Sequence, residues 1–107
     1  QPETVKEEVI QLGEYQFNHH RHTLTREGTE KKLTNREAEL LHLFCRNANR
    51  TIDRTHTLQS LWGDDSYFNA RSMDVFVSRL RKLLKHDPNI ELVNVRGKGY
   101  KLLIWEH

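Results

Sequence analysis

The sequence predicts an α+β domain in which a small antiparallel sheet precedes three helices and a C-terminal β-hairpin. Two observations support this fold class. Short alternating apolar stretches occupy residues 9–33, and apolar residues at helical spacing follow them as far as Pro88. A second alternating stretch, "VNVRGKGYKL" at residues 93–102, then contains Gly97 and Gly99, which are expected to allow the positive φ that a tight hairpin turn needs.

Length and composition are those of one small soluble domain. The chain has 107 residues, of which 36% are hydrophobic and 30% charged. Its longest apolar run, "LLIW", is too short to cross a bilayer, so we expect a cytoplasmic protein without membrane contact. The polar residues 1–8 are predicted to be a linker or a frayed terminus of a longer protein, and residues 9–107 the folded domain.

The N-terminal sheet is predicted from the alternating stretches "VIQL", "YQF", "TLT" and "KKL". Gly13, the stretch "NHHRH" and Gly28 separate these stretches, which is typical of turns between short strands. His20 and His22 are expected on one face of a strand, where they could supply two metal ligands. Because no further Cys or His lies at a diagnostic spacing, we predict no metal site.

The first helix is predicted over residues 35–47. Thr34 can cap its first turn, and Glu37 can return a hydrogen bond in a capping box. Its apolar residues Leu40, Leu41, Phe44 and Ala48 fall on one face, and the lone Cys45 is expected to pack beside them. A short second helix is predicted between Asp53 as its cap and Gly63 as its end.

The third helix, predicted over about residues 70–85 with Asn69 as its cap, carries two chemically different faces. The packing face is apolar and consists of Met73, Val77, Leu80 and Leu84, which Phe76 and Leu83 widen. The opposite face is basic and hydroxylic and consists of Arg71, Val75, Ser78 and Lys82, flanked by Ser72 and Arg79. Serine can bond base edges, valine can contact a thymine methyl, and arginine can bond guanine, so this face suits DNA better than plain solvent.

Positive charge is concentrated in the last third of the chain. Residues 71–107 hold eight Lys and Arg against four Asp and Glu, although the whole chain carries a net charge of only +2. Such a local basic surface attracts polyanions. Together with a helix, a short second helix, a loop, a basic helix and a basic hairpin, it predicts a winged helix-turn-helix.

Four stretches carry a resemblance to a known family: "LTNREAELLHLF", "LQSLWGDD", "RSMDVFVSRLRKLL" and "VNVRGKGYKL". In this order and spacing, the chain resembles the C-terminal effector domain of OmpR/PhoB-type bacterial response regulators. The resemblance implies a four-stranded N-terminal sheet, and a hairpin that also meets a short strand between the first two helices. It implies sequence-specific binding of double-stranded promoter DNA that controls transcription, with no enzymatic activity and no cofactor.

The resemblance also implies roles for individual residues. Helix residues 70–85 are expected in the major groove, with contacts from Arg71, Ser72, Val75, Phe76, Ser78 and Arg79, and from the basic neighbour Lys82. Arg96 is expected in the minor groove and Lys98 on a phosphate, while Trp62 and Tyr100 approach the phosphate backbone. Many relatives have histidine where this chain has Phe76, and some have arginine at Ser78, so base specificity cannot be transferred from them.

Partners follow from the same resemblance. The loop with Asp64, Asp65, Ser66 and Tyr67 corresponds to one that can touch RNA polymerase. A receiver domain, phosphorylated by a cognate histidine kinase, is expected upstream in the full-length protein. Because a domain this small without a receiver shows no obvious apolar interface stripe, we expect the isolated domain to be a monomer that pairs only on DNA.

Two other functions are compatible with parts of the sequence. A winged helix could serve only as a protein-interaction module, with Val75 and Phe76 as an apolar docking patch. A phosphate-binding loop at "RGKGYK" is disfavoured, because the spacing of a P-loop and its following helix are absent. Salt dependence distinguishes the first of these functions from DNA binding. The affinity of a DNA-binding domain for duplex DNA falls steeply as the salt concentration rises, whereas a protein-interaction module lacks this steep dependence.

Overall fold

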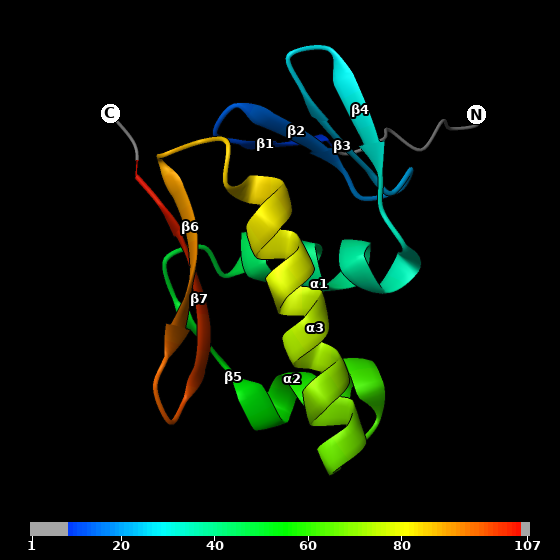
Figure 1. Ribbon diagram of the computed structural model, residues 1–107, viewed down its shortest axis with the longest axis vertical. Helices are drawn as coiled ribbons and strands as arrows, with labels where there is room; N and C mark the ends of the chain where they lie inside the picture. Colours follow the sequence, from blue (N-terminus) through cyan, green and yellow to red (C-terminus); the bar gives the residue numbers. More distant parts are fainter. Residues whose placement is uncertain (1–8, 106–107) are drawn as a thin grey trace, which may run out of the picture.

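The elements of the protein follow the predicted order (Figure 1). The structure is a computed structural model that describes residues 9–105, so the predicted linker at residues 1–8 lies outside the described residues. The elements are β1 (Val9–Leu12), β2 (Tyr15–Asn18), β3 (Thr23–Arg26), β4 (Thr29–Lys32), α1 (Asn35–Arg46), β5 (Thr51–Asp53), α2 (Arg54–Trp62), α3 (Tyr67–Leu84), β6 (Ile90–Val95) and β7 (Gly99–Ile104). None of these helices combines the length and hydropathy needed to cross a membrane.

Two antiparallel sheets flank the helices. The first has the strand order β1-β2-β3-β4, and the second has the order β5-β7-β6. The hairpin β6–β7 therefore also pairs with the short strand between α1 and α2, which confirms the expected fold. The first sheet lies at one end of the molecule, and the hairpin runs beside α3 toward the opposite end (Figure 1).

Helices α1 and α2 begin where the sequence predicts. The Thr34 side chain accepts a hydrogen bond from the Glu37 amide at 3.2 Å, and the Thr34 amide donates to Glu37 Oε1 at 2.8 Å, so the capping box is complete. Asp53 caps α2 by accepting from the His56 amide at 2.7 Å. Gly63, with φ 94°, ends α2 in the left-handed conformation.

Helix α3 begins earlier than predicted, and Asn69 is not its cap. Ser66 is the N-cap, and its hydroxyl accepts a hydrogen bond from the Asn69 amide at 3.3 Å. The Asn69 side chain instead donates to Asp64 Oδ1 at 2.7 Å, which closes the turn before the helix. Tyr67 consequently belongs to the first helical turn rather than to the loop.

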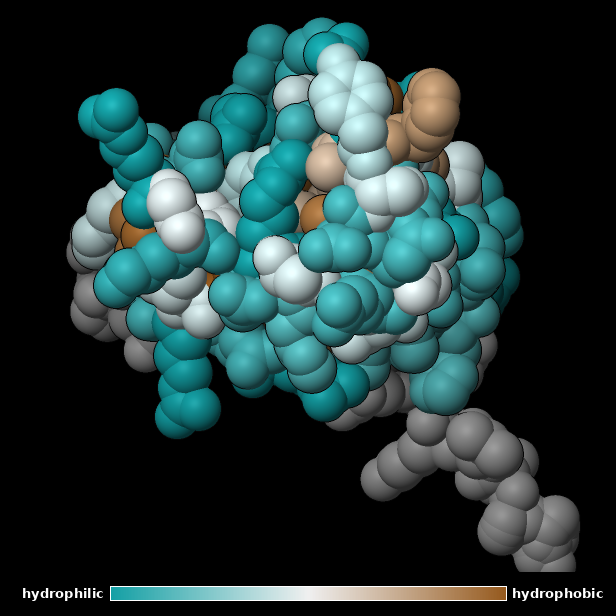
Figure 2. All heavy atoms as spheres, turned by 90° about the horizontal axis from the view of Figure 1, so that it is seen from below, coloured by the Kyte–Doolittle hydropathy of each residue, from teal (hydrophilic) through white to brown (hydrophobic). Residues whose placement is uncertain are grey.

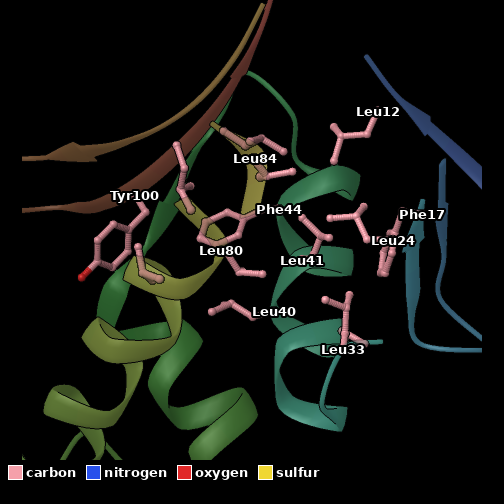
Figure 3. Packing of buried hydrophobic residues seen from close by; sticks show 14 of the residues in the cluster. Leu12, Phe17, Leu24, Leu33, Leu40, Leu41, Phe44, Leu80, Leu84 and Tyr100 are labelled. Atoms are coloured by element: carbon pink, nitrogen blue, oxygen red, sulfur yellow. The ribbon is translucent and has the colours of Figure 1, made fainter. Parts of the chain in front are cut away.

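The core joins the first sheet, α1, α3 and the hairpin (Figure 3). The predicted packing face of α3 is confirmed, since Met73, Val77, Leu80 and Leu84 are all buried. Cys45 packs against this core, and burial raises the pKa of its thiol to about 12. Packing of this face leaves the opposite face of α3 exposed to solvent.

The histidines do not share a strand face, which corrects that expectation. Residues 19–22 form the turn between β2 and β3, where His22 adopts a φ of 56°. His19 is the first residue of this turn, and its ring stacks on the ring of His42 in α1, with the ring centroids 3.9 Å apart. Within residues 9–105, no three His, Cys, Asp or Glu side chains gather into a group that could hold a metal ion.

Candidate nucleic-acid interface

The outer face of α3 presents the predicted basic and hydroxylic side chains. Arg71, Val75, Ser78, Arg79 and Lys82 are all exposed and border one hollow along the helix. Val75 is 49% exposed and is the one apolar member of this face, where it could contact a thymine methyl group. The end of the molecule that carries α2, the start of α3 and the hairpin tip is largely hydrophilic (Figure 2).

Two arginines of this face lie over aromatic rings of the same helix. The Arg71 guanidinium carbon lies 5.8 Å from the Tyr67 ring centroid, and that of Arg79 lies 5.1 Å from the Phe76 ring centroid. Within residues 9–105, neither arginine forms a salt bridge. Asp74 borders the same hollow and attracts Arg71, so a carboxylate partly offsets the charge of Arg71, whereas Arg79 has no salt-bridge partner within residues 9–105.

Trp62 and Ser72 contact each other beneath this face. The Trp62 indole Nε1 donates a hydrogen bond to Ser72 Oγ at 3.1 Å, and both side chains are partly buried. The Arg36 guanidinium covers the Trp62 ring at 4.6 Å from its centroid. The Ser72 hydroxyl thus already accepts a bond from α2, which ties the end of α2 to the start of α3.

The wing is the turn between β6 and β7, and Arg96 and Lys98 are both exposed on it. Gly97 has a φ of 76°, as expected for a tight turn. Gly99 does not adopt a positive φ, which corrects the expectation for this residue. A Cβ at Gly99 would lie 1.9 Å from the Ile52 carbonyl oxygen, so this glycine is required for the close approach of β5.

A polar network that sequence reasoning missed joins α2, α3 and β7, the strand that follows the wing. Arg54 Nη1 donates to Asp74 Oδ1 and to the Tyr100 hydroxyl, both at 2.6 Å, and Arg54 Nη2 donates to Asp74 Oδ2 at 3.2 Å. The Tyr100 hydroxyl also donates to Asp74 Oδ1. These three residues are far apart in the sequence, so no local pattern indicates that they meet.

The network holds Asp74 charged and Tyr100 neutral. The hydrogen bond from Arg54 lowers the pKa of Asp74, whereas burial raises the pKa of the Tyr100 hydroxyl, and its bond to Asp74 adds to this effect. Tyr100, expected at the phosphate backbone, is thus buried with its hydroxyl bound inside the protein. A polar hollow lined by Ser78, Arg81 and Asn94 separates the outer face of α3 from the wing.

The turn between α2 and α3 combines a fixed carboxylate with two exposed aromatic rings. Asp64 Oδ1 accepts from the Ser66 amide at 2.9 Å and from Asn69, and these hydrogen bonds lower the pKa of Asp64. Asp65 is exposed beside it. Tyr67 is 70% exposed and Phe68 83% exposed, so the apolar surface of this region lies on the first turn of α3.

The four-stranded sheet, the helix-turn-helix formed by α2 and α3, and the basic wing define a winged helix-turn-helix domain. A family model described as "Transcriptional regulatory protein, C terminal" matches residues 28–102. The chain belongs to this family, and its likeness to domains of the OmpR/PhoB type is thereby confirmed.

Individual relatives agree with this assignment. The chain is 46% identical over 95 residues to the transcriptional regulatory protein RprY of Bacteroides fragilis, a region that covers 89% of this chain and 40% of RprY. The DNA-binding domain of Klebsiella pneumoniae RstA, solved in complex with the RstA box, is 28% identical with a TM-score of 0.73, over 89% of this chain and 96% of that one. Response regulator DrrB of Thermotoga maritima, an OmpR/PhoB homologue, is 25% identical with a TM-score of 0.74, over 89% and 44% of the two chains.

Proposed function

We propose that this chain is the part of a two-component response regulator that binds promoter DNA sequence-specifically and so controls transcription. Helix α3 enters the major groove, and the wing reaches the adjacent minor groove. The observation that carries this proposal is the exposed basic face of α3 beside an exposed basic wing, both attached to one Arg54–Asp74–Tyr100 network. The solved complex of RstA with its DNA box supports the same use of this fold.

The proposed roles follow the surroundings of each side chain. Arg71, Val75, Ser78 and Arg79 read base edges, and Lys82 binds a phosphate. Trp62 and Tyr100 approach the phosphate backbone, but the polar atoms of both rings already bond within the protein. These two rings therefore shape the surface that the backbone meets, and Ser72 and Phe76 support it from within the helix.

Salt dependence tests the proposal against a protein-interaction module. The test uses a duplex that the domain selects from a random pool. Binding to this duplex releases cations from the phosphates, and their release is less favourable at high salt, so the affinity is expected to fall at least about tenfold between about 50 and 200 mM salt. Arg79→Ala is expected to weaken binding to the selected duplex by about 1 to 3 kcal/mol and to change binding to random DNA much less. Fluorescence anisotropy measures both effects. Equal losses on selected and random DNA would show that Arg79 does not read a base.

The two basic residues of the wing are expected to behave differently. Arg96→Ala should weaken binding most where the flanking sequence is A·T-rich, because the narrow minor groove attracts arginine strongly. Lys98→Ala should weaken binding on every flank alike and reduce the salt slope by about one. Titrations against A·T-rich and G·C-rich flanks at matched salt compare the two variants. If Arg96→Ala lost the same affinity on both flanks, the wing would act only as an electrostatic clamp.

RNA polymerase is a further proposed partner of the segment Asp64, Asp65, Ser66 and Tyr67, which spans the turn before α3 and the first residue of that helix. Support comes from the exposed rings of Tyr67 and Phe68, which lie beside the proposed DNA surface. Because Asp64 holds the turn and the Tyr67 ring lies under Arg71, Phe68→Ala is the cleaner substitution. It should lower transcription several-fold in a reconstituted assay while operator affinity changes little, and unchanged transcription would remove Phe68 from the proposed contact.

The rest of the regulator is also part of the proposal. The matched relative RprY is about two and a half times as long as the region it shares with this chain, which leaves room for a receiver domain phosphorylated by a histidine kinase. We propose that the domain alone is a monomer, that it pairs on adjacent half-sites, and that it acts in the cytoplasm. Sedimentation without DNA measures its oligomeric state.

A further inference from the structure

Four side chains from three helices lie next to one another in one continuous row behind the proposed DNA surface. The guanidinium of Arg36 in α1 lies 4.6 Å from the centroid of the Trp62 ring at the end of α2. The Trp62 ring lies 6.0 Å from the Phe76 ring in α3, at an interplanar angle of 59°. The guanidinium carbon of Arg79 in turn lies 5.1 Å from the centroid of the Phe76 ring. The row therefore runs from the body of the domain to its exposed basic face.

The inner part of this row is fixed, whereas its last member is exposed. Trp62 is held by its hydrogen bond to Ser72 and by Arg36, which itself donates to the Leu61 carbonyl oxygen. Phe76 is partly buried against this ring, and Arg79 is exposed. A guanidinium that stacks through its face keeps the N–H donors of its edge available for hydrogen bonds. No ion pair within residues 9–105 occupies those donors of Arg79.

We propose that Phe76 is a positioning residue for base reading, which acts through Arg79 rather than by touching DNA itself. The ring restricts the long Arg79 side chain to one orientation before DNA binds, so less conformational entropy is lost in the complex. This inference rests on the proposed reading of a base by Arg79. It predicts that the contribution of Phe76 disappears when Arg79 is absent.

A double-mutant cycle on DNA tests this dependence. The 107-residue chain and its Phe76→Leu, Phe76→Tyr, Arg79→Ala and Phe76→Leu/Arg79→Ala variants are titrated against the duplex selected from a random pool. Phe76→Leu is expected to weaken binding about three- to tenfold, whereas Phe76→Tyr, which keeps the ring, should restore most of the affinity. In the Arg79→Ala background, Phe76→Leu should cause no further loss. An equal loss in both backgrounds would overturn the inference and show that Phe76 contacts DNA or only supports the fold.

A measurement without DNA separates this inference from the proposed function. Side-chain NMR of the free protein should show the Arg79 δ protons shifted upfield by the Phe76 ring, with the shift retained in Phe76→Tyr and lost in Phe76→Leu. Phe76→Met serves in place of Phe76→Leu if the leucine variant unfolds. If Arg79→Ala left specific binding unchanged, base reading by Arg79 would fail and the inference with it. If Arg79→Ala weakened binding but neither ringless variant did, only the inference would be overturned.

Discussion

Replacing Asp87 with alanine is expected to lower the free energy of unfolding by about 2 to 4 kcal/mol. Asp87 is 1% exposed, although it is a carboxylate. Its Oδ2 accepts from the Glu14 amide at 2.8 Å, and its Oδ1 accepts from the Asn89 amide at 2.9 Å. Alanine would leave both amides without their charged acceptor. It would also disconnect the β1–β2 turn from the corner between α3 and β6.

Urea unfolding followed by circular dichroism measures this loss. Asp65→Ala is the matched control, because Asp65 is an exposed aspartate, and its replacement should change stability by less than about 0.5 kcal/mol. Asp87→Asn keeps one acceptor oxygen, so its loss of stability should lie between those of Asp65→Ala and Asp87→Ala. Overlapping unfolding curves for Asp87→Ala and Asp65→Ala would show that the buried carboxylate does not hold the sheet to the helical body.

The parts of the fold that depend on local spacing could be predicted from the sequence. The capping box of Thr34 and Glu37 spans four residues, and the buried stripe of α3 repeats with the period of a helix. For the same reason, the basic outer face of α3 and the charged wing could be recognised from the order of the residues alone. These features place the candidate interface, because an amphipathic helix of a small domain packs its apolar face and leaves its polar face in solvent.

The remaining features depend on contacts between distant residues or on competition between local ones. Asp74 and Tyr100 meet Arg54 only when α2, α3 and β7 are packed together, and nothing in the stretch "SMDVF" marks Asp74 as their partner. The start of α3 cannot be placed from the sequence because Ser66 and Asn69 are both good N-caps. In the structure the Asn69 side chain bonds to Asp64, and Ser66 caps the helix instead. The contact between the tilted rings of Phe76 and Trp62 likewise requires α2 and α3 to be packed.

Gly99→Ala is expected to lower the free energy of unfolding by about 2 to 3 kcal/mol and to weaken DNA binding as well. Gly99 pairs with Asp53, and an added Cβ would lie 1.9 Å from the Ile52 carbonyl oxygen and 2.9 Å from the Arg54 amide nitrogen. Both neighbours are backbone atoms, which cannot rotate away as a side chain can. Strand β5 must therefore separate from β7, and this movement displaces both the wing and the base of the Arg54 network.

The neighbouring glycine provides the control for this prediction. Gly97 has a φ of 76° and no atom within 4 Å of an added Cβ, so Gly97→Asn, a residue that tolerates the left-handed conformation, should cost less than about 1 kcal/mol. Both variants are compared by urea unfolding, and their affinities for the selected duplex are measured where both remain folded. The affinity should fall further for Gly99→Ala, because only this substitution moves the wing relative to α3. Equal stability and equal affinity of the two variants would mean that the contact between β5 and β7 does not set the position of the wing.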